Sequence, residues 1–314
     1  MGTTLVTGAS GFVGSHFMEE MKRRGLPVRG VTRGTVPGLI TIKTYGPEMN
    51  WSNCLKGVDT VVHLAARVHV MRETASDPLS LFREANVTAT VNLARQAAGA
   101  GVRRFVFVSS IKVNGERTEP GKPFTAGDPR NPQDPYGISK AEAEVALLEL
   151  GRQTGMEITI IRPPLVYGPG VRGNFRSLMK WAASGMPSIF AAVKNKRSFV
   201  HVENLCDLLI TVLDHPKAGN QVLLVSDGQD LSTHELIEKL ATAAGRRLKS
   251  IPVPSALLRC IGPLLRREAA IARLTDNLQV DIERTCRHLE WFPRNVATSI
   301  HDHRMIKRPM NTAG

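Results

Sequence analysis

Tyr136 and Lys140 stand four positions apart, and Ser110 precedes them at the end of an expected strand. Residues four apart on a helix lie on one face, one turn from each other. A lysine ammonium beside a phenol favours the phenolate and lowers a tyrosine pKa from its ordinary value of about 10. A serine hydroxyl there can hold a substrate hydroxyl or carbonyl next to the phenol. These residue types predict proton transfer at a substrate oxygen, although a Tyr and Lys pair alone is more often part of a helix surface.

A glycine-rich turn stands at the start of the chain. The β-forming run from Thr3 to Val6 leads directly into Gly8, Gly11 and Gly14 and then into an amphipathic helix. The first glycine allows a tight strand-to-helix turn, the second lets the backbone approach a pyrophosphate, and the third lets the helix pack close to the sheet. Two residues separate each pair of glycines, whereas the commoner pattern has one residue in the first gap. Because the turn follows the first strand and opens the first helix, it predicts a dinucleotide site at the helix N-terminus.

Strands and helices alternate in the first half of the chain, which predicts a parallel sheet with helices on both faces. The expected strands are 3–7, 28–32, 39–43, 60–64, 104–109 and 157–162, and the expected helices include 13–24, 78–98 and 134–152. Beyond Pro163, Pro and Gly residues interrupt the chain, and the expected strands and helices become shorter. We expect an α/β fold: a Rossmann-type doubly wound parallel sheet over 1–164 plus 198–225, a smaller mixed α/β substrate-binding lobe over 165–197 plus 226–300, and a flexible tail over 301–314.

Motifs along nearly the whole chain resemble those of the extended short-chain dehydrogenase/reductases. They are the turn at 7–14, His63-Leu64-Ala65-Ala66, Ser109-Ser110, the Tyr136 and Lys140 pair, Arg162-Pro163, and the segments 167–170 and 197–202. The segments 65–71 and 109–116 look most like a nucleotide-sugar branch of that family. This branch contains UDP-sugar 4-epimerases and the 4-ketoreductases that form UDP-N-acetylquinovosamine or UDP-N-acetylfucosamine.

The resemblance implies an NAD(P)-dependent enzyme that acts at C4 of a UDP-hexose. We expect a reductase of the C4 ketone of a UDP-2-acetamido-2,6-dideoxy-4-hexulose, in the biosynthesis of bacterial O-antigen or capsule sugars. Tyr136 would protonate the forming alkoxide, Lys140 would orient the nicotinamide ribose, and Ser110 would bond the same oxygen. The alternative is a UDP-glucose or UDP-N-acetylglucosamine 4-epimerase, which would oxidise C4 and return hydride to the other face. A non-catalytic dinucleotide sensor is a more remote alternative, because fold does not determine function.

The resemblance also implies which residues bind the cofactor and the substrate. Cofactor contacts are expected from Gly8, Ser10, Gly11, Phe12, Val13, Gly14, Leu64, Ala65, Ala66, Asn86, Tyr136, Lys140 and Pro163. Substrate contacts are expected from Ser109, Asn174, Ser188, Phe190, Arg197 and Arg273. The two arginines are assigned to the diphosphate, which a planar guanidinium binds through two hydrogen bonds. Each arginine could instead be a solvated surface residue.

Arg33, after the second expected strand, bears on the type of cofactor. An acid there would bind the adenosine ribose and select NAD, whereas an arginine suits a 2′-phosphate. Since the chain has Arg33 and no acid at this place, we expect NADP(H), with NAD(H) possible if Arg33 stacks on adenine instead. Where the family often has an aspartate for the adenine amine, the nearest residues are Tyr45 and Gly46.

The composition is that of an ordinary globular protein, with 314 residues, 42% hydrophobic and 22% charged. The net charge of +13 is compatible with a nucleic-acid partner, but the basic residues do not concentrate on one helix. Three tryptophans and three tyrosines leave few rings to stack on bases. A positive field also suits a dinucleotide and a nucleotide diphosphate. We therefore expect no nucleic-acid partner.

The remaining sequence features point to a cytoplasmic enzyme without metal. The four cysteines form no C-x-x-C pair and do not indicate a disulfide framework. No signal peptide precedes the first strand, and no apolar run approaches the roughly 20 residues that span a bilayer, so no membrane insertion is expected. The histidines lack metal-ligand spacing. By the resemblance, the helices 78–98 and 134–152 would pair with those of a second subunit in a homodimer.

Overall fold

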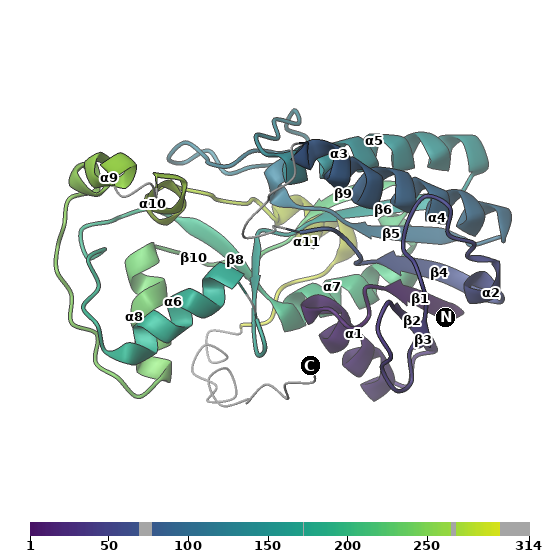
Figure 1. Ribbon diagram of the computed structural model, residues 1–314, viewed down its shortest axis with the longest axis horizontal. Coiled ribbons are helices and arrows are strands. Elements are labelled where there is room, and N and C mark those ends of the chain that lie inside the picture. The colour runs from purple at the N-terminus through teal and green to yellow at the C-terminus, as the bar shows by residue number, and fades with distance from the viewer. Residues whose placement is uncertain (69–76, 172, 265–267, 296–314) are drawn as a thin grey trace.

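The computed structural model describes residues 1–68, 77–171, 173–264 and 268–295, with the backbone alone for 174, 261–264 and 269. Its larger sheet has seven parallel strands in the order β3-β2-β1-β4-β5-β6-β9 (Figure 1). The strands are β1 (Thr3–Thr7), β2 (Val28–Thr32), β3 (Ile40–Thr41), β4 (Val58–His63), β5 (Arg104–Val108), β6 (Glu157–Arg162) and β9 (Gln221–Leu224). The central strands are buried on both faces, which explains their continuous runs of β-branched and aromatic residues.

Helices cover both faces of this sheet and confirm the expected doubly wound α/β fold. On one face, α1 (Phe12–Arg23) and α7 (Val202–Asp214) pack together and against the strands. On the other face, α4 (Ala89–Gly99) and α5 (Pro135–Thr154) bury alanine and leucine side chains against the sheet. The connecting elements are α2 (Ser52–Leu55) and the 3-10 turns η2 (Ile111–Val113) and η3 (Pro216–Ala218).

The helix expected over 78–98 is divided in the structure. It consists of α3 (Pro78–Arg83), a π-helical turn η1 (Glu84–Thr88) and α4. A π turn carries one extra residue and is frequent at functional sites. Here it contains Asn86, whose side chain is buried.

A smaller lobe has its own three-stranded sheet in the order β10-β8-β7, made of β7 (Leu165–Tyr167), β8 (Arg197–His201) and β10 (Asp230–Leu231). Its helices are α6 (Gly173–Ser184), α8 (Thr233–Ala243), α9 (Ser255–Leu264) and α10 (Glu268–Thr275). A separate apolar cluster that includes Phe175, Phe199 and Leu236 forms its core. This lobe lies at one end of the molecule, beyond the carboxyl ends of the large sheet's strands (Figure 1).

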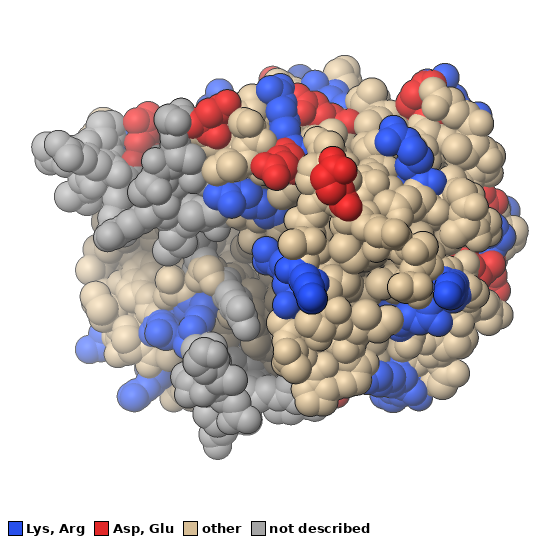
Figure 2. Space-filling view, turned by 45° about the vertical axis from the view of Figure 1, so that its right-hand side comes forward, with Lys and Arg blue, Asp and Glu red and all other residues tan. Residues whose placement is uncertain are grey.

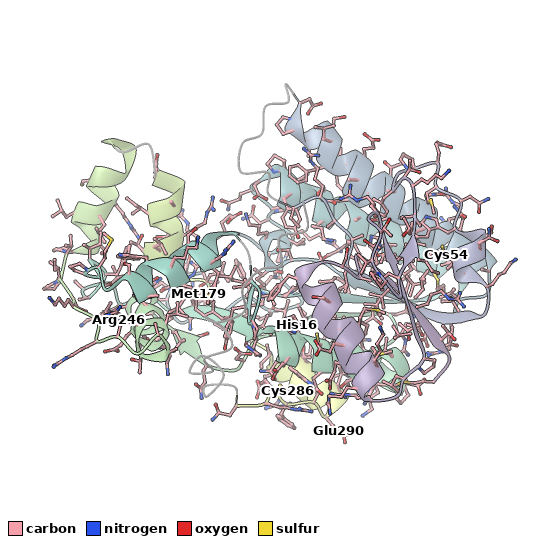
Figure 3. The ribbon with its side chains drawn as sticks, turned by 60° about the horizontal axis from the view of Figure 1, so that its bottom comes forward. His16, Cys54, Met179, Arg246, Cys286 and Glu290 are labelled. Atoms are coloured by element: carbon pink, nitrogen blue, oxygen red, sulfur yellow. The ribbon has the colours of Figure 1, made fainter. Side chains whose placement is uncertain are left out.

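The chain crosses between the lobes at places that differ from the expected boundaries. The strand β8 pairs with β7 and β10, so residues up to His201 belong to the smaller sheet. Conversely, α11 (Glu283–Leu289) and Trp291 pack into the larger lobe's core, where the Trp291 indole donates to Asp207 of α7 at 2.9 Å. Figure 3 shows Cys286 and Glu290 on the side of the larger lobe, far from Arg246 of the smaller lobe. The expected tail at 301–314 lies outside the described residues.

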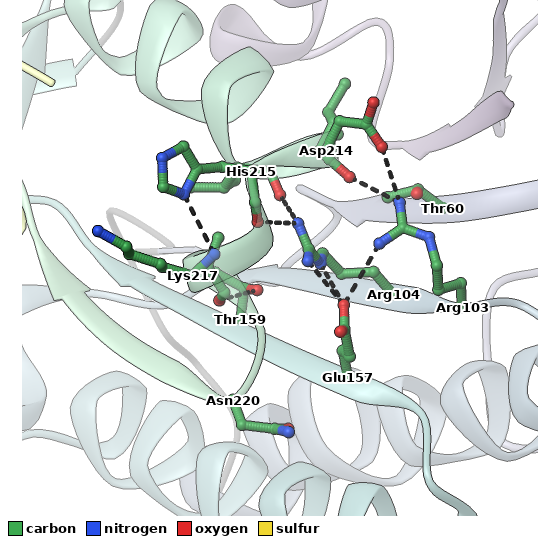
Figure 4. A network of polar contacts seen from close by, with 12 residues as sticks. Thr60, Arg103, Arg104, Glu157, Thr159, Asp214, His215, Lys217 and Asn220 are labelled. Atoms are coloured by element: carbon green, nitrogen blue, oxygen red, sulfur yellow. Dashed lines mark hydrogen bonds and ion pairs between the residues drawn. The ribbon is translucent and has the colours of Figure 1, made fainter. Parts of the chain in front are cut away.

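Two arginines hold the amino-terminal edge of the large sheet (Figure 4). The Arg104 side chain is 1% exposed, donates to Glu157 Oε2 at 2.7 Å and also to the carbonyls of Val212 and His215. Arg103 donates to the carbonyl of Leu213 at 2.9 Å. Guanidinium groups at the C-terminal end of α7 complement the helix dipole. This network stabilises the edge opposite the carboxyl ends, where ligands of open α/β sheets bind.

Within the described ranges, no helix has both the length and the apolar character needed to cross a bilayer. In the same part of the chain, no three His, Cys, Asp or Glu side chains gather as metal ligands would. Figure 2 shows one face, on which the blue Lys and Arg side chains are dispersed among other residues instead of forming one band.

Candidate active site

The glycine-rich turn has the geometry of an anion site. Gly8 has a φ of +69°, and a Cβ there would lie 2.8 Å from the Ala65 nitrogen, so only glycine fits. A Cβ on Gly14 would collide with the Gly8 carbonyl. The first turn of α1 begins at Phe12 without a side-chain cap among the described residues. Its open N–H groups lie at the carboxyl end of β1 and suit a pyrophosphate.

Ser10 and Thr32 connect this turn to the end of β2. Their hydroxyl oxygens are 2.8 Å apart, and the Gly34 amide also donates to Thr32 Oγ1 at 3.3 Å. Arg33 follows with an exposed side chain. It therefore stands directly after β2, close to the glycine-rich turn.

A buried histidine lies under the turn; from the sequence it was interpreted as a hydrogen-bonded structural residue and not as a metal ligand. His63 is fully buried at the end of β4; its Nδ1 lies 2.7 Å from Thr7 Oγ1, and its Nε2 lies 3.1 Å from the Tyr45 hydroxyl and 3.0 Å from Thr90 Oγ1. Burial lowers the pKa of His63 to about 3, so the ring is neutral. Tyr45, considered above as an adenine contact, directs its hydroxyl at His63, and burial raises its pKa to about 12.

Asn86 links three segments of the site, as expected for a residue that ties its helix to the cofactor-binding strands. Its Oδ1 accepts from the Arg67 amide at 2.7 Å, and its Nδ2 donates to the Arg67 carbonyl at 3.0 Å. The same Nδ2 donates to Ser139 Oγ at 3.0 Å. Asn86 therefore holds the segment after Ala65 and Ala66 against the helix that carries Tyr136 and Lys140.

The residues expected to transfer protons lie on η2 and α5. Ser110 is the N-cap of η2, just after β5, and Tyr136 is in the first turn of α5 with its ring edge-on to Phe82.

Lys140 is 2% exposed, with its ammonium 3.8 Å from the centre of the Phe107 ring. Burial lowers the Lys140 pKa to about 7, which Glu144 opposes. Burial, and then the Asp134 carboxylate, raise the pKa of Tyr136 well above its usual range.

A buried ion pair lies behind Lys140. Arg162 Nε donates to Glu144 Oε1 at 2.8 Å and Arg162 Nη2 donates to Glu144 Oε2 at 2.5 Å, with both side chains at most 2% exposed. Ser109 Oγ donates to Glu144 Oε1 at 2.6 Å. The Ser109 hydroxyl, expected at the substrate, is thus directed into the interior. The sequence motifs include Ser109 and Arg162 but not Glu144. The signal that could have identified Glu144 is its position four residues after Lys140, on the same face of the helix.

Arg197 lies on β8, half-buried, and its Nη1 donates to the Asp276 carbonyl at 3.0 Å. Burial lowers the pKa of Arg197 to about 10, while Asp276 and Glu116 oppose this and Arg273 adds to it. A second cation, Arg273, therefore lies within electrostatic range of Arg197. Arg273 itself is exposed on α10.

Of the other residues expected to contact the substrate, Ser188 and Phe190 are buried, and only the backbone of Asn174 is described. Ser188 is fully buried, and its backbone bonds to Lys249 and Ile251 instead of forming a regular strand. The Phe190 ring is buried in the small lobe's core against Trp181, with ring centres 5.7 Å apart. Asn174 lies in the first turn of α6, but its side chain is outside the described part of the structure.

Most of the residues expected to contact the cofactor lie at the carboxyl ends of the strands, along one edge of the large sheet. Gly8, Ala65 and Ser110 follow β1, β4 and β5, and Pro163 follows β6. Backbone hydrogen bonds join these ends: Leu64 N donates to the Thr7 carbonyl at 3.2 Å, and Ile111 N donates to the Pro163 carbonyl at 3.0 Å. The arrangement can bind a dinucleotide and present a phenol and an ammonium to a substrate oxygen beside it.

Known proteins share this sequence pattern and this fold. A profile of the family described as "NAD dependent epimerase/dehydratase family" matches residues 4–225. The chain is 45% identical over 295 residues to a Vibrio cholerae protein named UDP-glucose 4-epimerase, covering 92% of this chain and 90% of that one. A solved structure of MoeE5 in complex with UDP-glucose and NAD is 27% identical, with a TM-score of 0.76 over 96% and 97% of the two chains. The UDP-N-acetylglucosamine 4-epimerase of Bacillus cereus shares the fold, with a TM-score of 0.79 at 20% identity over 99% and 98% of the chains.

Proposed function

The chain belongs to the NAD dependent epimerase/dehydratase family, and on that premise we propose that it interconverts the C4 epimers of a UDP-hexose. The resemblance inferred from the motifs is thereby confirmed at the level of the family. The observation that carries the proposal is the presence of Ser110, Tyr136 and Lys140 beside a glycine-rich turn, in a chain so similar to the Vibrio cholerae relative. This favours the epimerase, which the sequence analysis held as the alternative, over the 4-ketoreductase.

The chain's own residues have distinct roles in this proposal. The backbone packs so closely at Gly8 and Gly14 that no side chain fits there. This tight turn leaves the first N–H groups of α1 available to a dinucleotide diphosphate. When bound, the nicotinamide supplies the hydride acceptor and donor. Tyr136 takes the proton of the C4 hydroxyl and later returns it, while Ser110 holds the same oxygen. Lys140 orients the ribose and adds positive charge, and Asn86 keeps its helix in register with the cofactor edge.

For the substrate, we propose that Arg197 and Arg273 bind the diphosphate from the small lobe. This proposal is supported by the effect of Arg273 on the pKa of Arg197, which places a second cation within electrostatic range of Arg197. Asn174, Ser188 and Phe190 stay proposed neighbours of the nucleotide on the family resemblance, with Ser188 and Phe190 contributing through backbone groups because their side chains are buried.

The test is to incubate purified protein with UDP-glucose, UDP-galactose and their N-acetyl forms without added cofactor. Epimerisation, together with NAD released on denaturation, is the expected result, because an epimerase regenerates its cofactor in each cycle. A protein that turns over only UDP-4-keto-sugars while consuming added NADPH would replace the epimerase with the reductase.

The second candidate is that 4-ketoreductase of surface-polysaccharide sugar biosynthesis. One observation favours it: the exposed Arg33 stands after β2, where an acid would select NAD, and a reductase can draw on NADPH. Arg33→Asp should then shift cofactor preference from NADP(H) toward NAD(H) without changing the reaction. For the epimerase we propose NAD, the cofactor bound with MoeE5.

We further propose that the enzyme is a cytoplasmic homodimer. The cysteines Cys54, Cys206, Cys260 and Cys286 are all free thiols, which suits a reducing compartment. The subunits would meet through α3, α4 and α5, where Val145 is 52% exposed.

A further inference from the structure

Lys112 belongs to the 109–116 motif but has no role in the proposal above. It lies on η2, two residues after Ser110, and its ammonium donates to Asp134 Oδ2 at 2.5 Å and to Glu116 Oε1 at 2.8 Å. The Lys112 side chain is only 17% exposed, and both carboxylates are partly sheltered as well. Lys112 therefore differs from a solvated surface pair, whose charges water screens.

Asp134 connects this ammonium to the helix that carries Tyr136. It is the N-cap of α5: its Oδ1 accepts from the Gly137 amide at 2.7 Å, while its Oδ2 accepts from Lys112. The two segments also touch through their backbones, because a Cβ on Gly137 would lie 3.1 Å from the Lys112 carbonyl. The two oxygens of the Asp134 carboxylate thus join η2, which begins after Ser110, to the first turn of α5.

The charge of Asp134 acts on Tyr136, two residues later. It raises the pKa of the phenol, in addition to the larger effect of burial. Charged groups near Tyr136 include Lys140, one turn later on its own helix, and Arg67, which lies over the Phe82 ring that packs on Tyr136. The neutral His63 of β4 lies within electrostatic range of Lys140. Lys112 pairs directly with Asp134 and also with Glu116.

We infer that Lys112 is a positioning residue: it holds and neutralises Asp134 and thereby fixes the first turn of α5, which carries Tyr136. With the Asp134 charge compensated, the Tyr136 hydroxyl is more acidic, and the role of this acidity in turnover rests on the proposed function. The effect on Tyr136 itself does not, and it can be measured without a substrate.

The experiment uses the NAD-loaded protein and its tyrosinate absorbance. The chain has three tyrosines, so subtracting the titration of Tyr136→Phe isolates Tyr136 from Tyr45 and Tyr167. We expect Lys112→Met to raise the Tyr136 midpoint by about one pH unit, since the nearby Asp134 carboxylate loses the positive charge of Lys112. Lys122→Met removes the same charge from an exposed pair with Glu119 in the same region and should leave the midpoint unchanged.

A double mutant separates compensation of charge from loss of structure. Asn is as good an N-cap as Asp, so Asp134→Asn keeps the start of α5 while it removes the carboxylate. In the Lys112→Met/Asp134→Asn protein the midpoint should return close to that of the unchanged protein, and Lys112→Arg should preserve it. An unchanged midpoint in Lys112→Met, or an equal rise in the single and the double mutant, would overturn the inference.

A direct contact between Lys112 and substrate is the competing explanation. It predicts a raised KM for the sugar with no shift of the midpoint, and that result too would overturn the inference. If the protein turns over no UDP-sugar while the midpoint shifts as expected, the proposed function fails and the positioning role of Lys112 stands.

Discussion

Lys140 is buried and Tyr136 is partly buried, and burial opposes the charge on each of them. Their spacing alone suggested that the lysine would lower the pKa of the tyrosine. In the structure the Lys140 pKa is about 7, so the lysine is only partly charged at neutral pH, and the Tyr136 pKa is raised. A cation added close to Tyr136 would favour its phenolate. In the proposed function, the positive charge of an oxidised nicotinamide would supply this when bound.

Tyr136→Phe tests the proton-transfer role. Loss of the hydroxyl should lower kcat by ~10²–10⁴-fold, the usual contribution of positioned acid–base catalysis. Binding of NAD, followed by calorimetry, should stay close to that of the unchanged protein, because the phenylalanine ring can keep the contact with Phe82. A mutant with comparable kcat would remove Tyr136 from the mechanism.

Arg197→Ala tests the diphosphate contact. Removing a charge-assisted hydrogen-bond donor should weaken UDP binding by ~1.5–3 kcal/mol, which calorimetric titration can measure, and leave NAD binding intact. Arg259→Ala is the matched control, since Arg259 is an exposed arginine bonded to the same Asp276, at Oδ1. If the two variants bind UDP equally well, Arg197 serves the small lobe's structure through the Asp276 carbonyl and not the substrate.

Among the elements, β5, β6 and α5 are held together behind the site by Glu144 and Arg162. The carboxylate accepts from Arg162 and from Ser109, so it fixes the strand ends that precede Ser110 and Pro163. Lys140 lies one turn earlier on the same helix. The position of the reacting groups therefore depends on a buried pair that touches neither substrate nor cofactor.

Glu144→Ala should cost about 3–5 kcal/mol of unfolding free energy, because it leaves the buried Arg162 charge uncompensated. Glu142→Ala is two residues away on the same helix and removes an exposed pair with Arg83, so it should cost at most about 1 kcal/mol. Urea unfolding measures both. Equal losses for the two variants would mean that Glu144 is not a buried support of the site.

Local sequence predicted those elements whose structure depends on near neighbours. The strands Thr3–Thr7, Val28–Thr32 and Glu157–Arg162 were predicted with their observed bounds, and the glycine-rich turn was predicted with its geometry. The strand expected at 39–43 shrinks to Ile40–Thr41, because it is the sheet's edge and pairs on one side only. The division of the 78–98 helix was not predicted, since the π turn is stabilised by distant partners of Asn86.

Long-range packing accounts for what the sequence did not reveal in the site. Glu144 is identifiable as a buried ion-pair partner only once β6 brings Arg162 beside α5. His63 likewise needs β1, α4 and the Tyr45 segment around it before its bonds are visible. The sequence supplied the reacting residues and their motifs, whereas the residues that support them come from contacts between distant segments.

Across the whole molecule, the two lobes are joined by continuous elements. The helix α7 starts directly after β8 of the smaller sheet, and its C-terminal end is held by Arg103 and Arg104 at the far edge of the larger one. After the small lobe, α11 packs against β9 and η3, and Trp291 just beyond it bonds Asp207 of α7. The small sheet, which carries Arg197 on β8, is thus connected directly to the large lobe through α7.

The proposed homodimer makes a prediction about Val145, an exposed apolar residue of α5. Val145→Glu would bury an unpaired carboxylate between subunits, which should weaken the dimer by about tenfold or more, as sedimentation at several concentrations would show. Ile251→Glu places the same charge at a similarly exposed apolar residue of the small lobe and should leave the dimer intact. A dimer that is unchanged by Val145→Glu would require a different interface, and a monomeric unmutated protein would exclude the homodimer.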